Sequence, residues 1–467
     1  MTDVPSSRTL PDATELLLQM QQGKRRCRDI VQEYLARLEE HHPQINAAVK
    51  VFKEQALQEA QSPQPGPLSG LPISVKETFG IQGETITAGS LRMPPIAVDE
   101  DCEIVKRVRA AGAIILARSN VPEFAMAGET ENLRYGRTNN PLDQTRTAGG
   151  SSGGEAALVA SGSTALGLGS DLLGSLRIPG AFCGVVGFKP ASDAVDKWGT
   201  WPVIDGYMDT WLALGPITRS VRDARLVYNV IADRPLREQR DVNGLRLVVP
   251  DPFAVRHDLP CLQQALTRAS QALHAHGMKR ELQPFGDVER YFLNLQPLLV
   301  HDVEHDLHRQ LVTSDGDVLS LTRELFRQLA GRPTIYSGLF QLLVASVIVR
   351  PRTSARVQRI IEDFEAGRRH YHAMLGSDGV MILPTLGLLA PKHRQMNRAS
   401  LKPGVNHDMT AVTFCNAMNL PAITIPAWSD PDPDTGLVPG VMLACAPGAE
   451  AALLDAAAVA ETALSAR

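Results

Sequence analysis

Ser175 is the residue whose type and surroundings first suggest chemistry. It lies in the stretch GSDLLGSLRIPG (169–180), close to Asp171 and Arg177, inside a glycine-rich segment that runs from 149 to 187. Dense glycine allows tight turns and close backbone approach. A serine becomes a nucleophile only when a neighbouring base removes its proton. The segment contains no histidine, so the most common base is missing from it.

Two known templates match this segment only in part. The stretch GGSSGG (149–154) fits the nucleophile elbow GxSxG at Ser151 and at Ser152. That elbow follows a strand, whereas the preceding NPLDQTRTA is polar and turn-like. GLGSDLLG (167–174) is a degenerate dinucleotide loop, and a lone match of this kind is weak. Packed glycine loops without any catalytic role are a further interpretation.

A neutral lysine can replace histidine as the base, provided that burial lowers its pKa from about 10.4 toward 7 or 8. Lys76 fits this requirement best, because it ends an apolar, strand-like run in LPISVKETFG (71–80). Lys189 in VVGFKP (185–190) is the second candidate. The residues by themselves leave this choice open.

The glycine-rich segment also carries a family resemblance. AGGSSGGEAALVASGSTALGLGSDLLGSLRIPGAFCGVVGFKP (148–190) resembles the signature of the amidase signature family, whose members hydrolyse amides with a Ser-cisSer-Lys triad. The resemblance extends through LPISVKETFG, ARSNVPEFA (117–125), GPITRSVRDA (215–224), NLPAITIP (419–426) and GVMLACAPG (440–448). It covers nearly the whole chain except about 255–370. It implies a serine amidohydrolase without cofactor or metal.

Position by position, the resemblance implies that Lys76 is the base, Ser151 the bridging serine and Ser175 the nucleophile. A cis peptide bond would precede Ser151. Ser151 would relay the Ser175 proton to neutral Lys76, and water would then hydrolyse the acyl-enzyme. The backbone N–H groups implied for the oxyanion hole are those of Leu172, Leu173, Gly174 and Ser175.

Three supporting residues and one departure from the family pattern accompany this triad. Ser152 adjoins the bridging serine, and Asp171 and Arg177 are expected to pair and hold the nucleophile turn. The family usually reads Asp-x-Gly-Gly-Ser, whereas here Leu173 replaces the first glycine. If that position needs a positive φ, leucine costs about 1 to 2 kcal/mol and distorts the hole. If it needs only space, Leu173 narrows or reshapes the acyl pocket.

Two other sets of side chains could take part in metal binding or catalysis. His301, His305 and His308 in HDVEHDLH have helical spacing suited to metal ligands, although the motif is not HExxH and a solvated helix face explains it more simply. Cys183 in AFCG has apolar flanks, which favour a core cysteine over a nucleophile. We therefore expect no metal site.

Strand-like and helical patterns alternate along the chain. The strand-like runs include AIILARS (113–119), VVGFK (185–189), LRLVVP (245–250), VMILPT (380–385), AITIPA (422–427) and GVMLACA (440–446). This alternation favours a sheet covered by helices, and the resemblance implies the same α/β fold: a three-layer α/β/α sandwich with a mixed, largely parallel central sheet. We expect one amidase domain over 1–467, with a helical N-terminal part at 1–60.

Substrate specificity is expected to reside in the variable, mainly helical segment 255–370, because family resemblance does not fix the substrate. Phe292, Leu339, Phe340 and Leu343 are the candidates for the wall of an apolar acyl or aryl pocket, with core packing as the alternative. The apolar run 335–349 is shorter than the roughly 20 residues that span a bilayer, so we expect no membrane span.

Composition limits the class of partner. The net charge of -4 gives no basic surface for nucleic acid, so a small-molecule substrate is expected. The six cysteines lack the spacing of a zinc site or a disulfide framework. The start MTDVPSSRTLPDATE has no secretory pattern, which predicts a cytoplasmic location. Homodimer formation is left open.

The expected activity is hydrolysis of carboxylic amides. Aryl amides, esters and carbamates (urethanes) are further candidates, because all carry a carbonyl with a heteroatom leaving group. A glutaminase-type subunit of an amidotransferase, which would pass ammonia to a partner protein, is the main alternative. A catalytically silent family member, suggested by Leu173, and a Ser-His-Asp esterase are the others.

Overall fold

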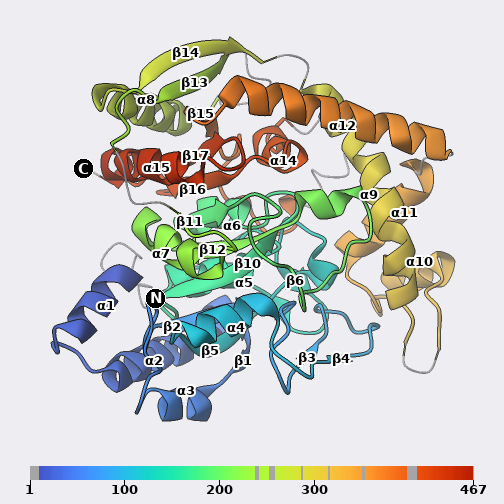
Figure 1. Cartoon of the computed structure of the whole chain (residues 1–467). Coiled ribbons are helices and arrows are strands. Elements are labelled where there is room, and N and C mark those ends of the chain that lie inside the picture. Colours follow the sequence, from blue (N-terminus) through green and yellow to red (C-terminus); the bar gives the residue numbers. More distant parts are fainter. Residues whose placement is uncertain are drawn as a thin grey trace.

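The computed structural model describes residues 10–236, 241–251, 258–285, 288–313, 316–349, 353–396 and 407–465. An eleven-stranded sheet runs through the middle of the molecule (Figure 1). In sheet order its strands are β1 (Ala48–Val51), β5 (Ile114–Ser119), β2 (Pro72–Lys76), β10 (Leu166–Asp171), β12 (Ala213–Thr218), β11 (Val186–Lys189), β16 (Ala422–Pro426), β17 (Gly440–Cys445), β15 (Gly379–Pro384), β13 (Arg246–Asp251) and β14 (Lys279–Pro284).

The sheet is mixed, as predicted, but it is not largely parallel. Parallel pairing joins β5 to β2, β2 to β10, β15 to β13 and β13 to β14. The other six pairings, from β10 through β15 and at the β1 edge, are antiparallel. The excess of antiparallel pairs corrects the expectation. The chain passes from β11 to β12 and from β16 to β17 without an α-helix that would carry it back across the sheet, so these neighbouring strands run antiparallel.

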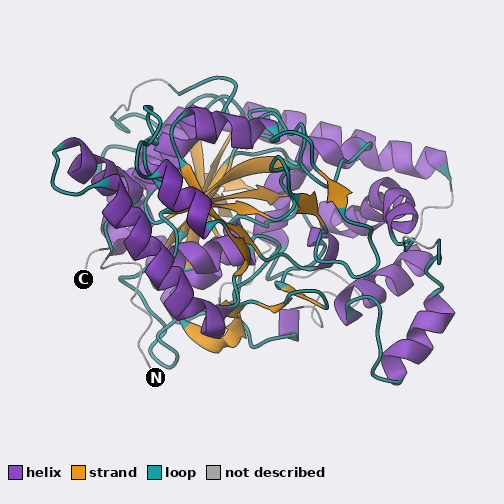
Figure 2. Ribbon diagram, turned by 90° about the horizontal axis from the view of Figure 1, so that it is seen from below, coloured by secondary structure: helices purple, strands orange, loops and turns teal. Residues whose placement is uncertain are grey.

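Helices cover both faces of this sheet, which confirms the α/β sandwich (Figure 2). They are α1 (Ala13–Gln21), α2 (Cys27–Ile45), α3 (Lys53–Glu59), α4 (Glu103–Ala110), α5 (Gly153–Ala160), α6 (Arg177–Cys183), α7 (Val221–Ile231), α8 (Pro260–Ala275), α9 (Glu289–Gln310), α10 (Leu321–Leu329), α11 (Ser337–Val349), α12 (Ser354–Leu375), α14 (Thr410–Ala417) and α15 (Glu450–Ser465). Short 3-10 turns are η2 (Glu123–Ala125) and η3 (Tyr207–Trp211). Small hairpins are β3 (Thr85–Ile86) with β4 (Ile96–Ala97), β6 (Glu131–Asn132) with β7 (Gly136–Arg137), and β8 (Asn139–Asn140) with β9 (Asp143–Thr147).

The side chains of β15 alternate between two hydrophobic clusters, one on each face of the sheet. Val380 and Ile382 enter the large hydrophobic cluster that includes residues of α8 and α15, whereas Met381 and Leu383 enter a second cluster with residues of α9, α12 and α14. Successive side chains of a strand point to opposite faces of its sheet. The second cluster, which we call the aromatic cluster, includes Trp211, Tyr291, Leu295, Phe364 and Phe414.

Two glycines of β10 allow α5 to lie directly on the sheet. A Cβ on Gly167 would overlap Glu155 Oε2, and a Cβ on Gly169 would come within 2.6 Å of Ser152 Oγ. A side chain at either position would force its neighbours to move, because real Cβ atoms essentially never come within 3.0 Å of another atom. This close approach sets the first turn of α5 against the ends of β2 and β10.

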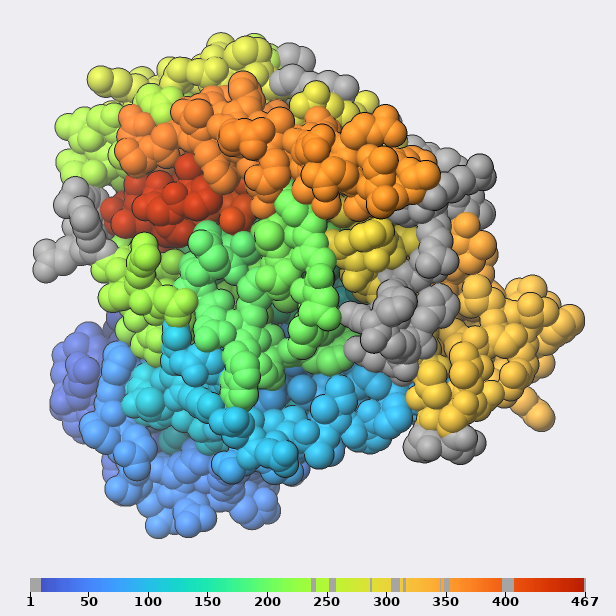
Figure 3. Space-filling view, turned by 45° about the vertical axis from the view of Figure 1, so that its right-hand side comes forward, coloured from blue at the N-terminus to red at the C-terminus, as the bar shows by residue number. Residues whose placement is uncertain are grey.

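The segment 255–370 is mainly helical where it is described, and contains α8 to α11, β14 and most of α12. Helices α10 and α11 lie at the edge of the molecule, and the space-filling view shows this gold-coloured part projecting from the body (Figure 3). Among the described residues, no helix is both long and apolar enough to cross a membrane.

Candidate active site

Lys76 is the last residue of β2, and every residue of that strand is buried. Because β2 lies between β5 and β10, its end is enclosed on both sides. The Lys76 side chain is completely buried, and its Nζ lies 2.7 Å from Ser151 Oγ, 3.0 Å from Ser152 Oγ and 2.9 Å from Ser170 Oγ. The lysine and the bridging serine that the sequence predicted are therefore in hydrogen-bond contact.

Burial also changes the acidity of this lysine. Removal from water lowers the pKa of Lys76 to about 7, although the negative charges of Asp171 and Glu155 oppose the shift. A buried ammonium group without a paired carboxylate is unfavourable, so the neutral amine gains population. The side chain thus meets the physical requirement for a general base near neutral pH.

Ser151 and Ser152 lie in the loop that opens α5. The peptide bond between Gly150 and Ser151 is cis, as the family resemblance implied. Ser152 N–H donates to the carbonyl oxygen of Ser175 at 3.2 Å, and this bond holds the loop beside the nucleophile turn. Ser151 is 2% exposed, whereas Ser175 is partly exposed and accessible from solvent.

The turn that carries Ser175, the predicted nucleophile, runs from the end of β10 into α6. Gly174 N–H donates to Asp171 Oδ1 at 2.8 Å, so this donor, one of the four expected for the oxyanion hole, already has a partner. In the described structure the backbone N–H groups of Leu172, Leu173 and Ser175 have no such partner. The set of free donors is therefore smaller than the sequence predicted.

Asp171 and Arg177 form the predicted pair beneath this turn. Their side chains are fully buried, with Arg177 Nε 3.0 Å from Asp171 Oδ2 and Nη2 3.1 Å from Oδ1. Burial would raise the pKa of Asp171, but Arg177, Lys189 and the Asn416 amide outweigh it and hold that pKa well below its usual range. Asn416 on α14 also donates to Asp171 Oδ1 at 2.8 Å. The pair therefore fixes the turn and leaves no free charge beside Ser175.

Leu173 occupies its position without backbone strain. The positive φ in the turn, +105°, belongs to Gly174, and Leu173 is not among the residues with positive φ. The Leu173 side chain is partly exposed and packs against the aromatic cluster. Of the two explanations that the sequence left open, strain is thus excluded.

Two residues of the site were missed by the sequence analysis. Ser170 is one of the three hydroxyl partners of Lys76, and Glu155 is a fully buried carboxyl on α5 that accepts from Ser74 Oγ. Burial raises the pKa of Glu155 to about 8, although Ser74, Ser119 and Lys76 oppose the shift. Both residues lie within the glycine-rich segment, but their contacts depend on the pairing of β2 with β10.

Other candidates lie apart from this cluster. Lys189 Nζ donates to the Pro190 carbonyl oxygen at 3.0 Å, and in the described structure no hydrogen bond joins it to a serine of the site, so Lys76 remains the better candidate for the base. Cys183 is buried and its thiol pKa is raised by burial, as expected for a core cysteine.

His301 contacts Asp302, whereas the side chains of His305 and His308 lie outside the described residues. The described residues contain no group that could hold a metal.

The four candidate pocket residues separate into two places. Phe292 lines a small cavity beside the aromatic cluster. Leu339 and Leu343 are 3% and 1% exposed inside a hydrophobic cluster with Trp201, and Phe340 packs against that cluster. Leu339, Phe340 and Leu343 therefore pack as core residues, the alternative that the sequence had left open.

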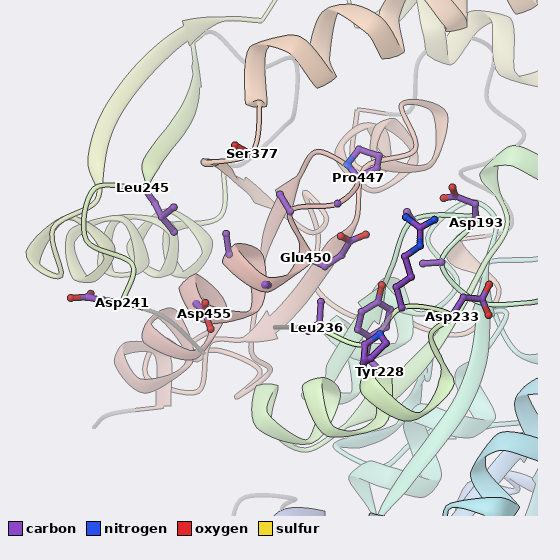
Figure 4. A pocket seen from close by; sticks show the side chains of 18 residues that line it. Asp193, Tyr228, Asp233, Leu236, Asp241, Leu245, Ser377, Pro447, Glu450 and Asp455 are labelled. Atoms are coloured by element: carbon purple, nitrogen blue, oxygen red, sulfur yellow. The ribbon is translucent and has the colours of Figure 1, made fainter. Parts of the chain in front are cut away.

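A larger cavity lies elsewhere, against α7 and the first turn of α15 (Figure 4). Asp193, Tyr228, Asp233, Glu450 and Asp455 are among its lining residues. None of the residues predicted for catalysis lines it. Lys76 and its hydroxyl partners Ser151, Ser152 and Ser170 lie instead at the ends of β2 and β10.

Comparison with known proteins shows to which family the chain belongs. The profile of the Amidase family matches residues 29–454. The chain belongs to the amidase signature family. A solved amidase is 25% identical to this amidase signature protein, with a TM-score of 0.81. The match covers 97% of this chain and 99% of the solved amidase. A second solved structure is of a vestigial complex that bears on the origin of an s-triazine catabolic enzyme. Its chain is 27% identical to this one, with a TM-score of 0.78, and the match covers 97% of this chain and 98% of that one.

Curated relatives of this family member include glutamyl-tRNA(Gln) amidotransferase subunits. The protein from Nitratidesulfovibrio vulgaris (strain DP4) is 38% identical over 251 residues, which are 49% of this chain and 50% of the relative. The protein from Cyanothece sp. is 31% identical over 330 residues, which are 69% of this chain and 62% of the relative. The chain spans about half the length of the first of these relatives.

Proposed function

We propose that this protein is a serine amidohydrolase that cleaves carboxylic amides through an acyl-enzyme on Ser175. The observation that carries the proposal is the contact of 2.7 Å between Ser151 Oγ and a fully buried Lys76 whose pKa is about 7. Family membership supports hydrolysis of C–N bonds. Aryl amides, esters and carbamates are included as candidate substrates.

The arrangement of hydrogen bonds suits a neutral lysine. A neutral amine has two N–H donors and one lone pair, and Lys76 Nζ has three hydroxyl partners. Ser152 Oγ donates to the Ser170 carbonyl oxygen at 3.2 Å, so it is free to accept from Lys76. With Ser152 and Ser170 as acceptors, the lone pair faces the Ser151 hydroxyl.

The mechanism follows from this orientation. Ser175 Oγ attacks the carbonyl carbon while its proton passes to Ser151 and the Ser151 proton passes to Lys76. The free N–H groups of the turn stabilise the resulting oxyanion. Lys76 and Ser151 return a proton to the leaving nitrogen, the C–N bond breaks, and the acyl group stays on Ser175. Water repeats these steps and releases the carboxylic acid.

A second candidate function comes from the curated relatives, which are amidotransferase subunits. In that case the chain would release ammonia from glutamine and pass it to a partner protein. The absence of strain at Leu173 counts against a third candidate, a catalytically silent protein.

The test compares ammonia or amine release from acetanilide-type amides and from L-glutamine by the purified chain. The proposal predicts hydrolysis of the simple amides without any partner, with complete loss in Ser175→Ala. If glutamine is the single substrate that is hydrolysed, and the active form is a stable complex of this chain with another protein, the amidotransferase role would be established instead.

A further inference from the structure

We propose that Glu155 is a positioning residue that stabilises the ammonium form of Lys76 while this base holds the proton taken up during the attack of Ser175. This inference rests on the proposed function and adds to it a residue that acts through Lys76. Glu155 is completely buried on α5, and the relay described above gives it no part. A buried carboxyl is unfavourable unless a nearby group compensates its charge, so its place beside the site calls for a role.

Two contacts between β2 and α5 place the Glu155 carboxyl beside the Lys76 side chain. Lys76 Nζ reaches Ser152 Oγ at 3.0 Å, and Ser74 Oγ donates to Glu155 Oε2. Ser74 and Lys76 are two residues apart on one strand, so their side chains leave the same face of β2. Ser152 and Glu155 are three residues apart at the start of α5, so they are neighbours on one side of that helix. Gly167, which pairs with Ser74 across the sheet, has no side chain and leaves the space that Glu155 Oε2 fills.

The charges around the Lys76 amine come from two carboxyl groups, and these differ in what balances them. Asp171, at the end of β10, and Glu155, on α5, both act against the effect of burial on the pKa of Lys76. Asp171 is bound to the Arg177 guanidinium through two contacts, so its charge is already balanced. Among the described residues, Lys76 is the cationic group that acts on Glu155. The charge of Glu155 is therefore available to the lysine.

The surroundings of Glu155 allow it to carry a negative charge when Lys76 is protonated. Burial raises the pKa of Glu155 to about 8, and the hydroxyls of Ser74 and Ser119 together with the charge of Lys76 oppose this shift. Glu155 is also the third residue of α5, where the partial positive charge of a helix N-terminus favours a carboxylate. Ionised Glu155 and protonated Lys76 favour each other, so the two groups titrate together.

A carboxyl in this place reconciles two demands on the base. Lys76 must be neutral before the reaction, and burial supplies this by lowering its pKa to about 7. Lys76 must then accept the proton of Ser151, which places a positive charge in the interior of the protein. An uncompensated buried charge is strongly unfavourable, and a base that holds its proton poorly is a weak catalyst. The Glu155 carboxylate compensates this charge at the moment when it forms.

The experiment measures the midpoint of the acid limb of kcat/KM for a neutral amide in the wild type, Glu155→Gln and Glu155→Asp. Glu123→Gln, which removes another buried carboxyl on η2, is the matched control. We expect the midpoint to fall by about one pH unit or more in Glu155→Gln, because Lys76 loses an opposite charge that favours its ammonium form. Glu155→Asp keeps the charge and should lie closer to the wild type than to Glu155→Gln. The control should match the wild type.

A merely structural role of Glu155 predicts a different result, in which both variants lose rate while the midpoint stays in place. An unchanged midpoint in Glu155→Gln would therefore overturn the inference, and so would a shift to higher pH. Ser74→Ala removes the hydroxyl that binds the carboxyl and makes its ionised form less favourable. That variant should also lower the midpoint, and it repeats the test if Glu155→Gln does not fold.

NMR titration of the Lys76 amine separates this inference from the proposed function, because it needs no turnover. Lysines are labelled with carbon-13 at Cε, and the Lys76 signal is the one that is missing from Lys76→Met. We expect the titration midpoint of this signal to fall in Glu155→Gln as the kinetic midpoint does. Hydrolysis by every variant with an unshifted Lys76 signal would overturn the inference alone. If no variant shows hydrolysis that depends on Ser175, the proposed function is refuted, whatever the signal does.

Discussion

The pH dependence of the reaction tests the role of Lys76 quantitatively. An ordinary lysine is neutral in roughly one molecule in several thousand at pH 7, because its pKa is about 10.4. Complete burial lowers the pKa of Lys76 to about 7, so about half of the molecules hold the free amine. The shift corresponds to about 5 kcal/mol against the ammonium form. Burial therefore raises the population of the base by about three orders of magnitude.

Two measurements follow from this value. In the wild type, kcat/KM for a neutral amide should fall tenfold for each pH unit below a midpoint near 7, because protonated Lys76 cannot accept the Ser151 proton. Lys76→Ala should lower kcat/KM at pH 8 by about 10² to 10⁴ and should abolish this acid limb. A limb that persists unchanged in Lys76→Ala, or a wild-type midpoint near 10, would refute the reasoning.

The same shift predicts a stability effect. Between pH 7 and 10.5 the unfolded lysine is protonated while the folded one is neutral, so the unfolded chain binds more protons. The free energy of unfolding contributed by Lys76 therefore rises with pH in this window, by up to about 1.4 kcal/mol per unit. The free energy of unfolding is measured with denaturant at several pH values across this window, for the wild type and for Lys76→Met. If it changes with pH equally in both proteins, the assignment of the shifted pKa to Lys76 is contradicted.

Three further predictions concern the framework of the site. Ser170→Ala should lower kcat/KM about tenfold with KM little changed, since it removes one hydrogen bond that orients Lys76; an effect on KM alone would argue against this role. Arg177→Met should lower the free energy of unfolding by about 3 to 5 kcal/mol, because it leaves Asp171 buried and unpaired, and an unchanged urea midpoint would be inconsistent with that. Gly167→Ala should destabilise by about 1 to 3 kcal/mol through its clash with Glu155, and thermal unfolding at wild-type temperature would count against the close packing of α5 on β10.

Sequence patterns identified most of the strands that build the sheet. β5, β11, β13, β15, β16 and β17 each coincide with an apolar run that the sequence analysis singled out. β10 was not predicted, because its sequence LGLGSD lacks the β-branched and aromatic residues typical of strands. Its glycines are explained by the packing of α5, which only the tertiary structure reveals. The excess of antiparallel pairing escaped prediction for a similar reason, since strand order is not encoded in local patterns.

The candidate site was predictable only in part. The type of residue and the apolar runs around it favour Lys76 over Lys189 as the base without deciding between them, and the family resemblance supplies that choice together with Ser151 and Ser175. Ser170 could not be found, because its contact with Lys76 depends on which strand lies beside β2. The partner of the Gly174 N–H group likewise depends on where the Asp171 side chain points. Such contacts join residues through the turn geometry and the sheet, which spacing along the chain does not determine.

Intact-mass spectrometry after reaction with a fluorophosphonate tests the central claim most directly. The account predicts one covalent adduct on the wild type, mapped to Ser175, absent from Ser175→Ala and formed far more slowly in Ser151→Ala and Lys76→Ala. An adduct that maps to another residue, or that forms at the wild-type rate in Lys76→Ala, would contradict the Lys76–Ser151–Ser175 relay.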